Sequence, residues 1–199
     1  TLNDIDQVLI HANSAGAGAN LIDFSGATVS SGLSFAVGPE FATNGTQNFN
    51  LTATGQADTV TGSAGADTVS GDAGTDLVYG NAGADSLNGG DGADTLFGGA
   101  GNDTLNGDAD ADVLNGGVGD DSLAGGTAND LLDGGAGNDI INNIGGSDMF
   151  DGGDGSDTLV TDISTGFDER SFEIGFDTVS GTHGRLNSDL GQDTIASIE

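Results

Sequence analysis

Residues 89–107 read GGDGADTLFGGAGNDTLNG, in which a glycine pair, an aspartate and a leucine recur after nine residues. The nine-residue frame defined by this spacing runs without a slip from Ala53 to Val160 and gives twelve units. Position 6 of the frame is an aspartate in every unit: Asp58, Asp67, Asp76, Asp85, Asp94, Asp103, Asp112, Asp121, Asp130, Asp139, Asp148 and Asp157. Position 8 is apolar in every unit: Val60, Val69, Val78, Leu87, Leu96, Leu105, Leu114, Leu123, Leu132, Ile141, Phe150 and Leu159. Two columns filled in this way indicate a chain built from structural repeats.

A unit with one obligatory apolar residue does not fit an amphipathic helix, which needs three or four apolar positions in two turns. It fits a short strand at positions 7 to 9, whose middle side chain points inward, with a turn at positions 1 to 6. Position 1 is glycine except at Ala53 and Asn143, and position 2 is Gly, Asn or Asp in nine units, residue types that tolerate positive φ. We therefore predict an all-β solenoid in which two units close a coil of about 18 residues. Odd and even units then build two parallel sheets, and their loops stack along two edges.

The charge of the chain is almost entirely negative. Its 199 residues include 32 Asp and Glu but only 2 Lys and Arg, which gives a formal net charge of −30. Such a surface repels nucleic acid and anionic membranes, and attracts cations. No apolar run approaches the about 20 residues that cross a bilayer, so no membrane insertion is expected. The absence of cysteine excludes disulfides and thiolate metal ligands.

The twelve units resemble the GGxGxDxUx nonapeptides of the RTX family, secreted bacterial proteins whose repeats bind calcium. The resemblance covers 108 of the 199 residues. It implies a right-handed parallel β-roll in which each Ca²⁺ lies between successive loops on one edge. It also implies that Asp carboxylates and backbone carbonyls of both loops hold the ion, which makes the twelve position 6 aspartates the predicted metal ligands.

Electrostatics independently favours a bound cation. Stacked turns would bring neighbouring Asp carboxylates to about 5 Å from one another, where like charges repel by about 1 kcal/mol in water and by more at a partly dry surface. Residues 53–160 contain 20 Asp and no Glu, Lys or Arg. Six loops on each edge leave five gaps, so one divalent ion in each gap gives about ten ions and about +20 of charge. The two sums match.

Calcium is the expected ion because every candidate ligand in the repeats is an oxygen atom. Residues 53–160 contain neither Cys nor His, the usual zinc ligands, and irregular cages of carbonyls suit Ca²⁺ better than the strict octahedron of Mg²⁺. The alternative is that each position 6 aspartate only forms an Asx-turn with its own backbone.

Some units depart from the consensus. Position 4 is glycine except at Gln56, Asp110 and Ala128, so we expect weaker or shifted loops in those units. Unit eleven begins with Asn143 and Ile144 in place of two glycines. The first and last loops lack one stacking neighbour, which makes Asp58 and Asp157 the least secure ligands.

The outer faces of the two sheets are expected to differ. Positions 7 and 9 point outward, and the even units carry mostly Thr, Ser and Asn there. The odd units carry an apolar set: Leu77, Tyr79, Phe97, Val113, Leu131 and Met149. Tyr79 and Phe97 lie one coil apart in the same column and are expected to stack. We expect this face either to be covered by an end segment of the chain or to dock another domain or another copy.

The end segments are β-like without the nonapeptide. Residues 1–52 are predicted to form an N-terminal β-rich cap, residues 53–160 the roll, and residues 161–199 a C-terminal β-rich cap. The stretch LGQDTIA recovers positions 3 to 9 of a further partial unit, which makes Asp193 another candidate ligand. The chain begins at Thr1 and stops inside the strand-like DTIASIE, so we expect it to be a piece of a longer, truncated protein.

No catalytic constellation stands out, so an enzyme is not expected. His11 and His183 lie in opposite end segments, and no nucleophile is placed beside either by the sequence. We expect a calcium-binding structural module of a secreted or cell-surface bacterial protein. The resemblance implies type I export of an unfolded chain and folding in extracellular calcium. Two alternatives stay open: the non-catalytic C-terminal portion of an exported protease or lipase, and an adhesive solenoid.

Overall fold

The computed structural model describes residues 7–8, 20–23, 34–36, 48–143, 145–161 and 194–195, and the regular structure in these ranges is β throughout. The strands form two sheets. The odd-strand sheet contains β1 (Gln7–Val8), β3 (Ser34–Ala36), β5 (Thr59–Thr61), β7 (Leu77–Ala82), β9 (Thr95–Ala100), β11 (Val113–Val118), β13 (Leu131–Ala136), β15 (Met149–Asp151) and β17 (Thr194–Ile195). The even-strand sheet contains β2 (Asn20–Asp23), β4 (Phe49–Thr52), β6 (Thr68–Ala73), β8 (Ser86–Asp91), β10 (Thr104–Ala109), β12 (Ser122–Gly126), β14 (Ile140–Asn143) and β16 (Thr158–Thr161).

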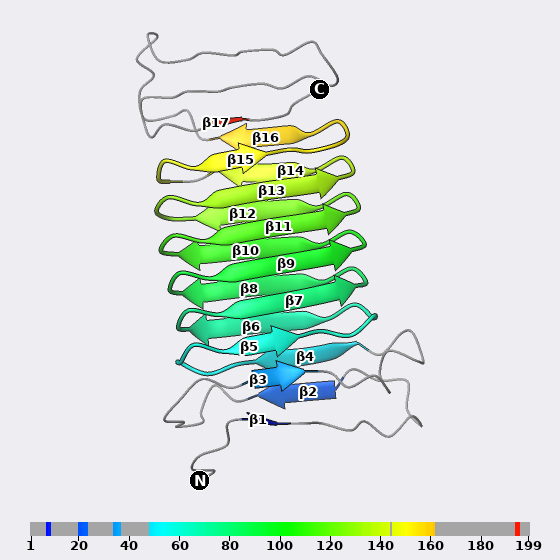
Figure 1. Ribbon diagram of the computed structural model, residues 1–199, viewed down its shortest axis with the longest axis vertical. Helices are drawn as coiled ribbons and strands as arrows, with labels where there is room; N and C mark the ends of the chain where they lie inside the picture. Colours follow the sequence, from blue (N-terminus) through cyan, green and yellow to red (C-terminus); the bar gives the residue numbers. More distant parts are fainter. Residues whose placement is uncertain are drawn as a thin grey trace.

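The two sheets are joined into a parallel β-solenoid, as the nine-residue period predicts. Leu105 on β10 pairs with Leu87 on β8 and Leu123 on β12, so one coil takes 18 residues. Successive strands alternate between the sheets and point in opposite directions across the stack (Figure 1). The register therefore places equivalent positions of every second unit directly above one another.

The strands are longer than the expectation of three residues. β7 and most of its neighbours contain six residues, because pairing continues beyond position 9 to positions 2 and 3 of the next unit. Asn81 pairs with Gly99 and Ala82 with Ala100, for example. The turn is thus confined to positions 4 to 6, which differs from the predicted turn over positions 1 to 6.

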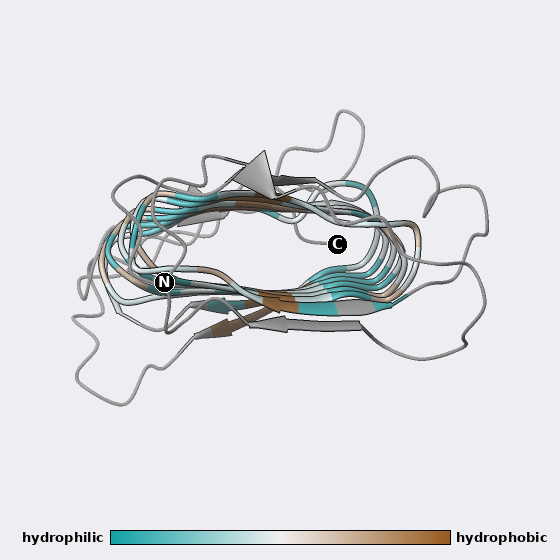
Figure 2. Cartoon of the chain, turned by 90° about the horizontal axis from the view of Figure 1, so that it is seen from below, coloured by the Kyte–Doolittle hydropathy of each residue, from teal (hydrophilic) through white to brown (hydrophobic). Residues whose placement is uncertain are grey.

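A single file of apolar side chains from each sheet fills the interior. The position 8 residues from Val60 to Phe150 are at most 3% exposed, and Leu159 packs against them partly buried. Seen along the stack, the solenoid is a flat oval with hydrophobic segments in the middle of both sheets and hydrophilic segments toward its rounded edges (Figure 2). The core is therefore narrow, and each coil contributes one large side chain from each sheet.

The described strands of the end segments continue the same sheets. β1 pairs with β3 and β3 with β5, while β2 pairs with β4 and β4 with β6. Leu51 pairs with Val69 and is 1% exposed, so the core column extends beyond the first nonapeptide. The limits of the two caps, at residues 52 and 161, stay predictions.

At the other end, β17 confirms the register predicted for the partial unit. Thr194 pairs with Met149 and Ile195 with Phe150, which places them in the position 7 and position 8 columns. Asp193 itself lies outside the described residues, as do His11, His183 and Ile144. Within the ranges that are described, no helix long and apolar enough to cross a membrane occurs.

Candidate metal centre

The position 6 aspartates form two ladders, one on each edge of the solenoid. Each of these side chains is between 1% and 7% exposed, with Asp157 the most exposed. The first ladder contains Asp58, Asp76, Asp94, Asp112, Asp130 and Asp148, and the second contains Asp67, Asp85, Asp103, Asp121, Asp139 and Asp157. The structure thus brings all twelve predicted ligands of the repeats into stacked columns.

Hydrogen bonds between coils fix one oxygen of ten of the twelve carboxylates, from Asp76 to Asp157. The backbone N–H of Asp85 donates to Oδ1 of Asp103 at 2.8 Å, and the N–H of Asp103 donates to Oδ1 of Asp121 at 2.7 Å. The same bond recurs from coil to coil along both ladders at 2.7–2.9 Å. Because the donor lies one coil away, these Oδ1 bonds are not the local Asx-turns of the alternative reading.

The second oxygen of most of these carboxylates is buried without a hydrogen-bond partner. This holds for Oδ2 of Asp76, Asp85, Asp94, Asp103, Asp112, Asp121, Asp130, Asp139 and Asp157. A buried acceptor with no partner costs about 1–3 kcal/mol, and more when it is charged. Native structures satisfy nearly all such groups, so a regular series of them points to a bound species that supplies positive charge.

Glycine at position 1 makes room for these unpartnered oxygens. A Cβ on Gly98 would contact Oδ2 of Asp103 and would lie 2.6 Å from the carbonyl oxygen of Gly116 in the next coil. The same pair of oxygens surrounds Gly62, Gly71, Gly80, Gly89, Gly107, Gly116 and Gly134. A carboxylate of one coil and a carbonyl of the next therefore face the same small space, which is a donor set suited to Ca²⁺.

The loops adopt a repeated backbone conformation. Positions 2 and 4 have positive φ in most units, including Asp72 at 77° and Gly92 at 124°. Asp110 at 70° and Ala128 at 86° keep this conformation although they are not glycine. In those two units the φ angle at position 4 therefore does not show the expected shift of the loop. The weaker metal binding expected of these units stays a prediction.

Burial raises the pKa of eight ladder carboxyls: Asp76, Asp85, Asp94, Asp103, Asp112, Asp121, Asp130 and Asp139. Burial is the largest effect on Asp76, Asp85 and Asp112, and it raises the pKa of each to about 7 although a backbone N–H opposes the shift. For Asp121 the same causes raise the pKa to about 6. Neighbouring carboxylates on the ladder add to the rise. A cation beside these groups would restore the charged form at neutral pH.

The remaining ligands of such a cation would have to come from the backbone. Among the residues that the structure describes, no three His, Cys, Asp or Glu side chains converge on one point. Carbonyl oxygens such as that of Gly116 are the available donors. That carboxylates and carbonyls share the site stays a prediction.

Two side-chain features of the loops were not predicted. On the second edge, Asn102 Oδ1 accepts from the backbone N–H of Asp120 at 3.1 Å, and Asp120 Oδ1 accepts from that of Asn138 at 2.8 Å. In the first two units, the position 2 hydroxyls donate hydrogen bonds to the ladder carboxylates, Thr54 to Asp58 and Ser63 to Asp67. The only sequence signals were Asn and Asp at position 5 of several units, including Asn129 on the first edge, and hydroxyls at position 2 where other units have Gly, Asn or Asp.

The outer face of the odd-strand sheet carries the predicted apolar side chains beside polar ones, while Ile140 and Val160 are exposed on the even-strand sheet. Tyr79 and Phe97 stack with their ring centroids 5.0 Å apart and an interplanar angle of 6°. Val113, Leu131 and Met149 are 37%, 47% and 58% exposed. The docking of a partner on this face stays a prediction.

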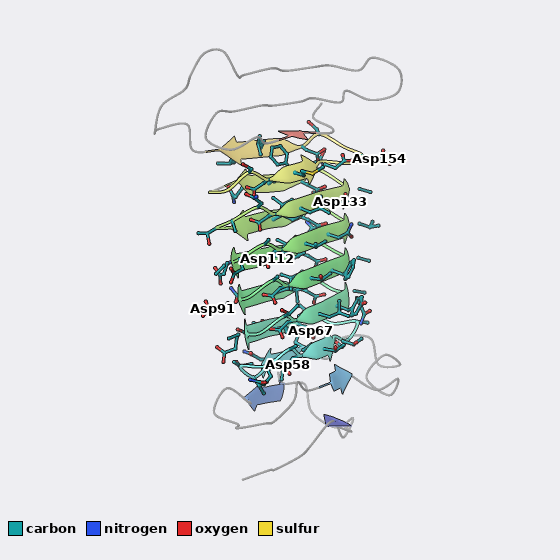
Figure 3. The ribbon with its side chains drawn as sticks, turned by 60° about the vertical axis from the view of Figure 1, so that its left-hand side comes forward. Asp58, Asp67, Asp91, Asp112, Asp133 and Asp154 are labelled. Carbon is teal, nitrogen blue, oxygen red and sulfur yellow. The ribbon has the colours of Figure 1, made fainter. Side chains whose placement is uncertain are left out.

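Carboxylates outside the ladders lie farther from the interior. Asp91 and Asp154 are exposed and lie at opposite edges of the stack, which Figure 3 shows together with the ladder residues Asp58, Asp67 and Asp112. These exposed groups add negative charge near the loops without the burial of position 6.

Comparison with known families matches this chain to the RTX calcium-binding nonapeptide repeat (4 copies). The matches cover residues 52–87, 79–114, 88–123, 115–143 and 145–162, which together span more than half of the chain. No curated protein matched the chain.

Proposed function

The chain belongs to the family of RTX calcium-binding nonapeptide repeats, and we propose that it is a structural module that folds when Ca²⁺ binds along its two aspartate ladders. The observation that carries the proposal is the series of nine buried Oδ2 atoms without partners, seven of which lie beside a carbonyl oxygen of the next coil. Bound Ca²⁺ would supply the positive charge that these oxygens need. The free energy of binding would then add directly to the free energy of folding.

The position 6 aspartates would hold the ions between successive loops. One oxygen of each carboxylate would stay on the backbone N–H of the neighbouring coil, and the other would face the metal. The position 1 glycines, such as Gly98, would keep the space beside Oδ2 clear of side chains. About ten ions, one in each gap, would balance the charge of residues 53–160. Asp193 would extend the first ladder by one member.

The setting of the module is part of the same proposal. A chain with a net charge of −30 and a mean hydropathy of −0.14 has little apolar surface with which to offset charge repulsion. It would stay unfolded where calcium is scarce and fold where calcium is abundant. This behaviour suits a bacterial protein that a type I system exports unfolded and that acts outside the cell or on its surface.

Calcium titration tests the proposal. We expect far-ultraviolet circular dichroism of the chain in chelator at neutral pH to show mainly coil, and millimolar Ca²⁺ to produce a β spectrum cooperatively. Mg²⁺ at the same concentration serves as the control and should leave the coil spectrum unchanged, because it dehydrates reluctantly and requires octahedral geometry. A β spectrum that is identical in chelator and in calcium would contradict the proposal.

Single aspartates test the ladders. We expect Asp94→Ala and Asp103→Ala, one on each edge, to raise the calcium concentration at the folding midpoint roughly tenfold, equivalent to about 1.4 kcal/mol. Asp91→Ala is the matched control, since it removes the same charge from an exposed position at the end of β8, three residues before Asp94. The assignment of Asp94 and Asp103 as ligands fails if their midpoints shift no more than that of Asp91→Ala.

A further inference from the structure

The first two loops of the array, residues 53–58 and 62–67, differ in backbone conformation from the loops that follow. Position 2 is Thr54 in one and Ser63 in the other, and neither has positive φ. Gln56 and Gly65 at position 4 also lack the positive φ found at this position in all later units. The backbone of these two loops therefore presents different groups to the position 6 carboxylate.

In both loops, Oδ2 of the position 6 carboxylate accepts two hydrogen bonds from the position 2 residue. Thr54 donates from its backbone N–H and from Oγ1 to Oδ2 of Asp58, both at 2.8 Å. Ser63 donates from its backbone N–H at 2.7 Å and from Oγ at 2.9 Å to Oδ2 of Asp67. The donors are themselves buried, with Thr54 0% and Ser63 6% exposed. Oδ2 thus has hydrogen-bond donors at Asp58 and Asp67, whereas it has none at Asp76 and Asp85 in the following coil.

A cation and these donors exclude one another. The hydrogen atoms of an N–H and an O–H carry partial positive charge and point at Oδ2, so Ca²⁺ on the same oxygen would face repulsion from both. Displacing them would break two buried hydrogen bonds to Oδ2 in each loop. We propose that loops 53–58 and 62–67 are metal-free clamps, in which the position 2 residue does by hydrogen bonding what Ca²⁺ does in the later loops. This proposal rests on the proposed calcium function for those later loops, and it removes Asp58 and Asp67 from the twelve aspartates proposed above as ligands.

The clamps lie where they can start the array. The backbone N–H of Asp58 donates to Asp76 Oδ1 and that of Asp67 to Asp85 Oδ1, so the clamped coil supplies the first bonds to the unclamped coils. Val60 and Val69 of this coil and Leu51 of the coil before it are each 1% exposed and belong to the core column. In a stack of repeats each coil is stabilised chiefly by its neighbours, so a coil that closes without metal gives the calcium loops a surface on which to stack.

Counting bound ions tests the clamps. We expect native mass spectrometry in calcium to show that Asp58→Asn and Asp67→Asn bind as many ions as the unmodified chain, whereas Asp103→Asn and Asp112→Asn bind at least one fewer. Asparagine has nearly the same shape and keeps an oxygen acceptor at Oδ1, which makes the four variants comparable. If Asp58→Asn or Asp67→Asn lost as many ions as Asp103→Asn, the clamp proposal would be wrong. If the unmodified chain and all variants bound none, the proposed calcium function would be wrong instead.

Amide hydrogen exchange in chelator tests the clamps without any metal. We expect the N–H groups of Thr54 and Ser63 to stay protected at least tenfold more than the position 2 amides of Gly99 and Gly117. Ser63→Ala should remove the protection in its own loop, and Ser63→Thr should retain it because the hydroxyl is kept. Equal exchange at Thr54, Ser63 and the two glycines would overturn the proposal, even if calcium binds elsewhere.

Discussion

In chelator, lowering the pH from about 8 to about 5 will convert the unfolded chain into the β-solenoid without calcium. Burial raises the pKa of Asp76, Asp85 and Asp112 to about 7 and that of Asp121 to about 6. In the unfolded chain these carboxyls titrate near the ordinary value of about 3.9. The folded state therefore binds protons more tightly than the unfolded state. The stability that the folded state gains from protonation of these carboxyls is complete below about pH 4 and is lost as the pH rises through about 6 to 7.

Far-ultraviolet circular dichroism against pH in chelator measures this effect. The range should end near pH 5, because the chain has a pI of about 4.1 and loses its solubilising charge below that value. In saturating calcium the same scan should stay flat around neutral pH, since Ca²⁺ and protons compete for the same oxygens. Asp76→Asn and Asp112→Asn imitate the protonated form, so they should shift the acid transition to higher pH. A chain that stays coil throughout the scan would show that desolvation of these carboxyls is much weaker than their burial indicates.

Leu114→Ala will destabilise the calcium-loaded solenoid by about 2–5 kcal/mol. Leu114 is 0% exposed, and it pairs with Leu96 on one side and Leu132 on the other. Because the core is a single file of side chains, no second layer can move in to fill the cavity. A stack of repeats also depends on each interface between neighbours, so a defect in the middle weakens both halves.

Thermal unfolding in saturating calcium measures this loss. Val113→Ala is the matched control: it removes two methyl groups from the adjacent residue, which is 37% exposed on the outer face. Its unfolding temperature should lie close to that of the unmodified chain, while that of Leu114→Ala falls by several degrees or more. Equal unfolding temperatures for the two variants would contradict the single-file core.

The arrangement of the coils follows from side chains at fixed positions of the repeat. The leucine column requires an inward-facing residue every nine residues, and this sets the pairing of Leu114 with Leu132. The stacking of Tyr79 on Phe97 follows from the same 18-residue coil. The aspartate columns were predictable for the same reason, because a strict period leaves one place in each loop for position 6.

The bonds that hold the aspartates did not follow from the period. Asp103 Oδ1 accepts from the N–H of Asp85 only at one particular displacement of the two coils relative to each other. No local pattern in the sequence predicts that displacement. The strand length was underestimated because pairing passes through a residue with positive φ at position 2, such as Asn81 at 78°. The hydrogen bonds to Asp58 and Asp67 depend on the φ of Thr54 and Ser63. The same residue in a left-handed conformation would point its backbone N–H away from the carboxylate.

The stacked pair of Tyr79 and Phe97 gives the molecule an intrinsic optical reporter. Tyr79 is the single tyrosine, and the chain has no tryptophan, so ultraviolet emission under excitation near the tyrosine band comes from one known place. Its ring lies on Phe97 of the adjoining coil, 5.0 Å away, and not on a residue of its own strand. The emission and near-ultraviolet dichroism of this ring will therefore record the moment at which β7 and β9 come together, without any added dye or label.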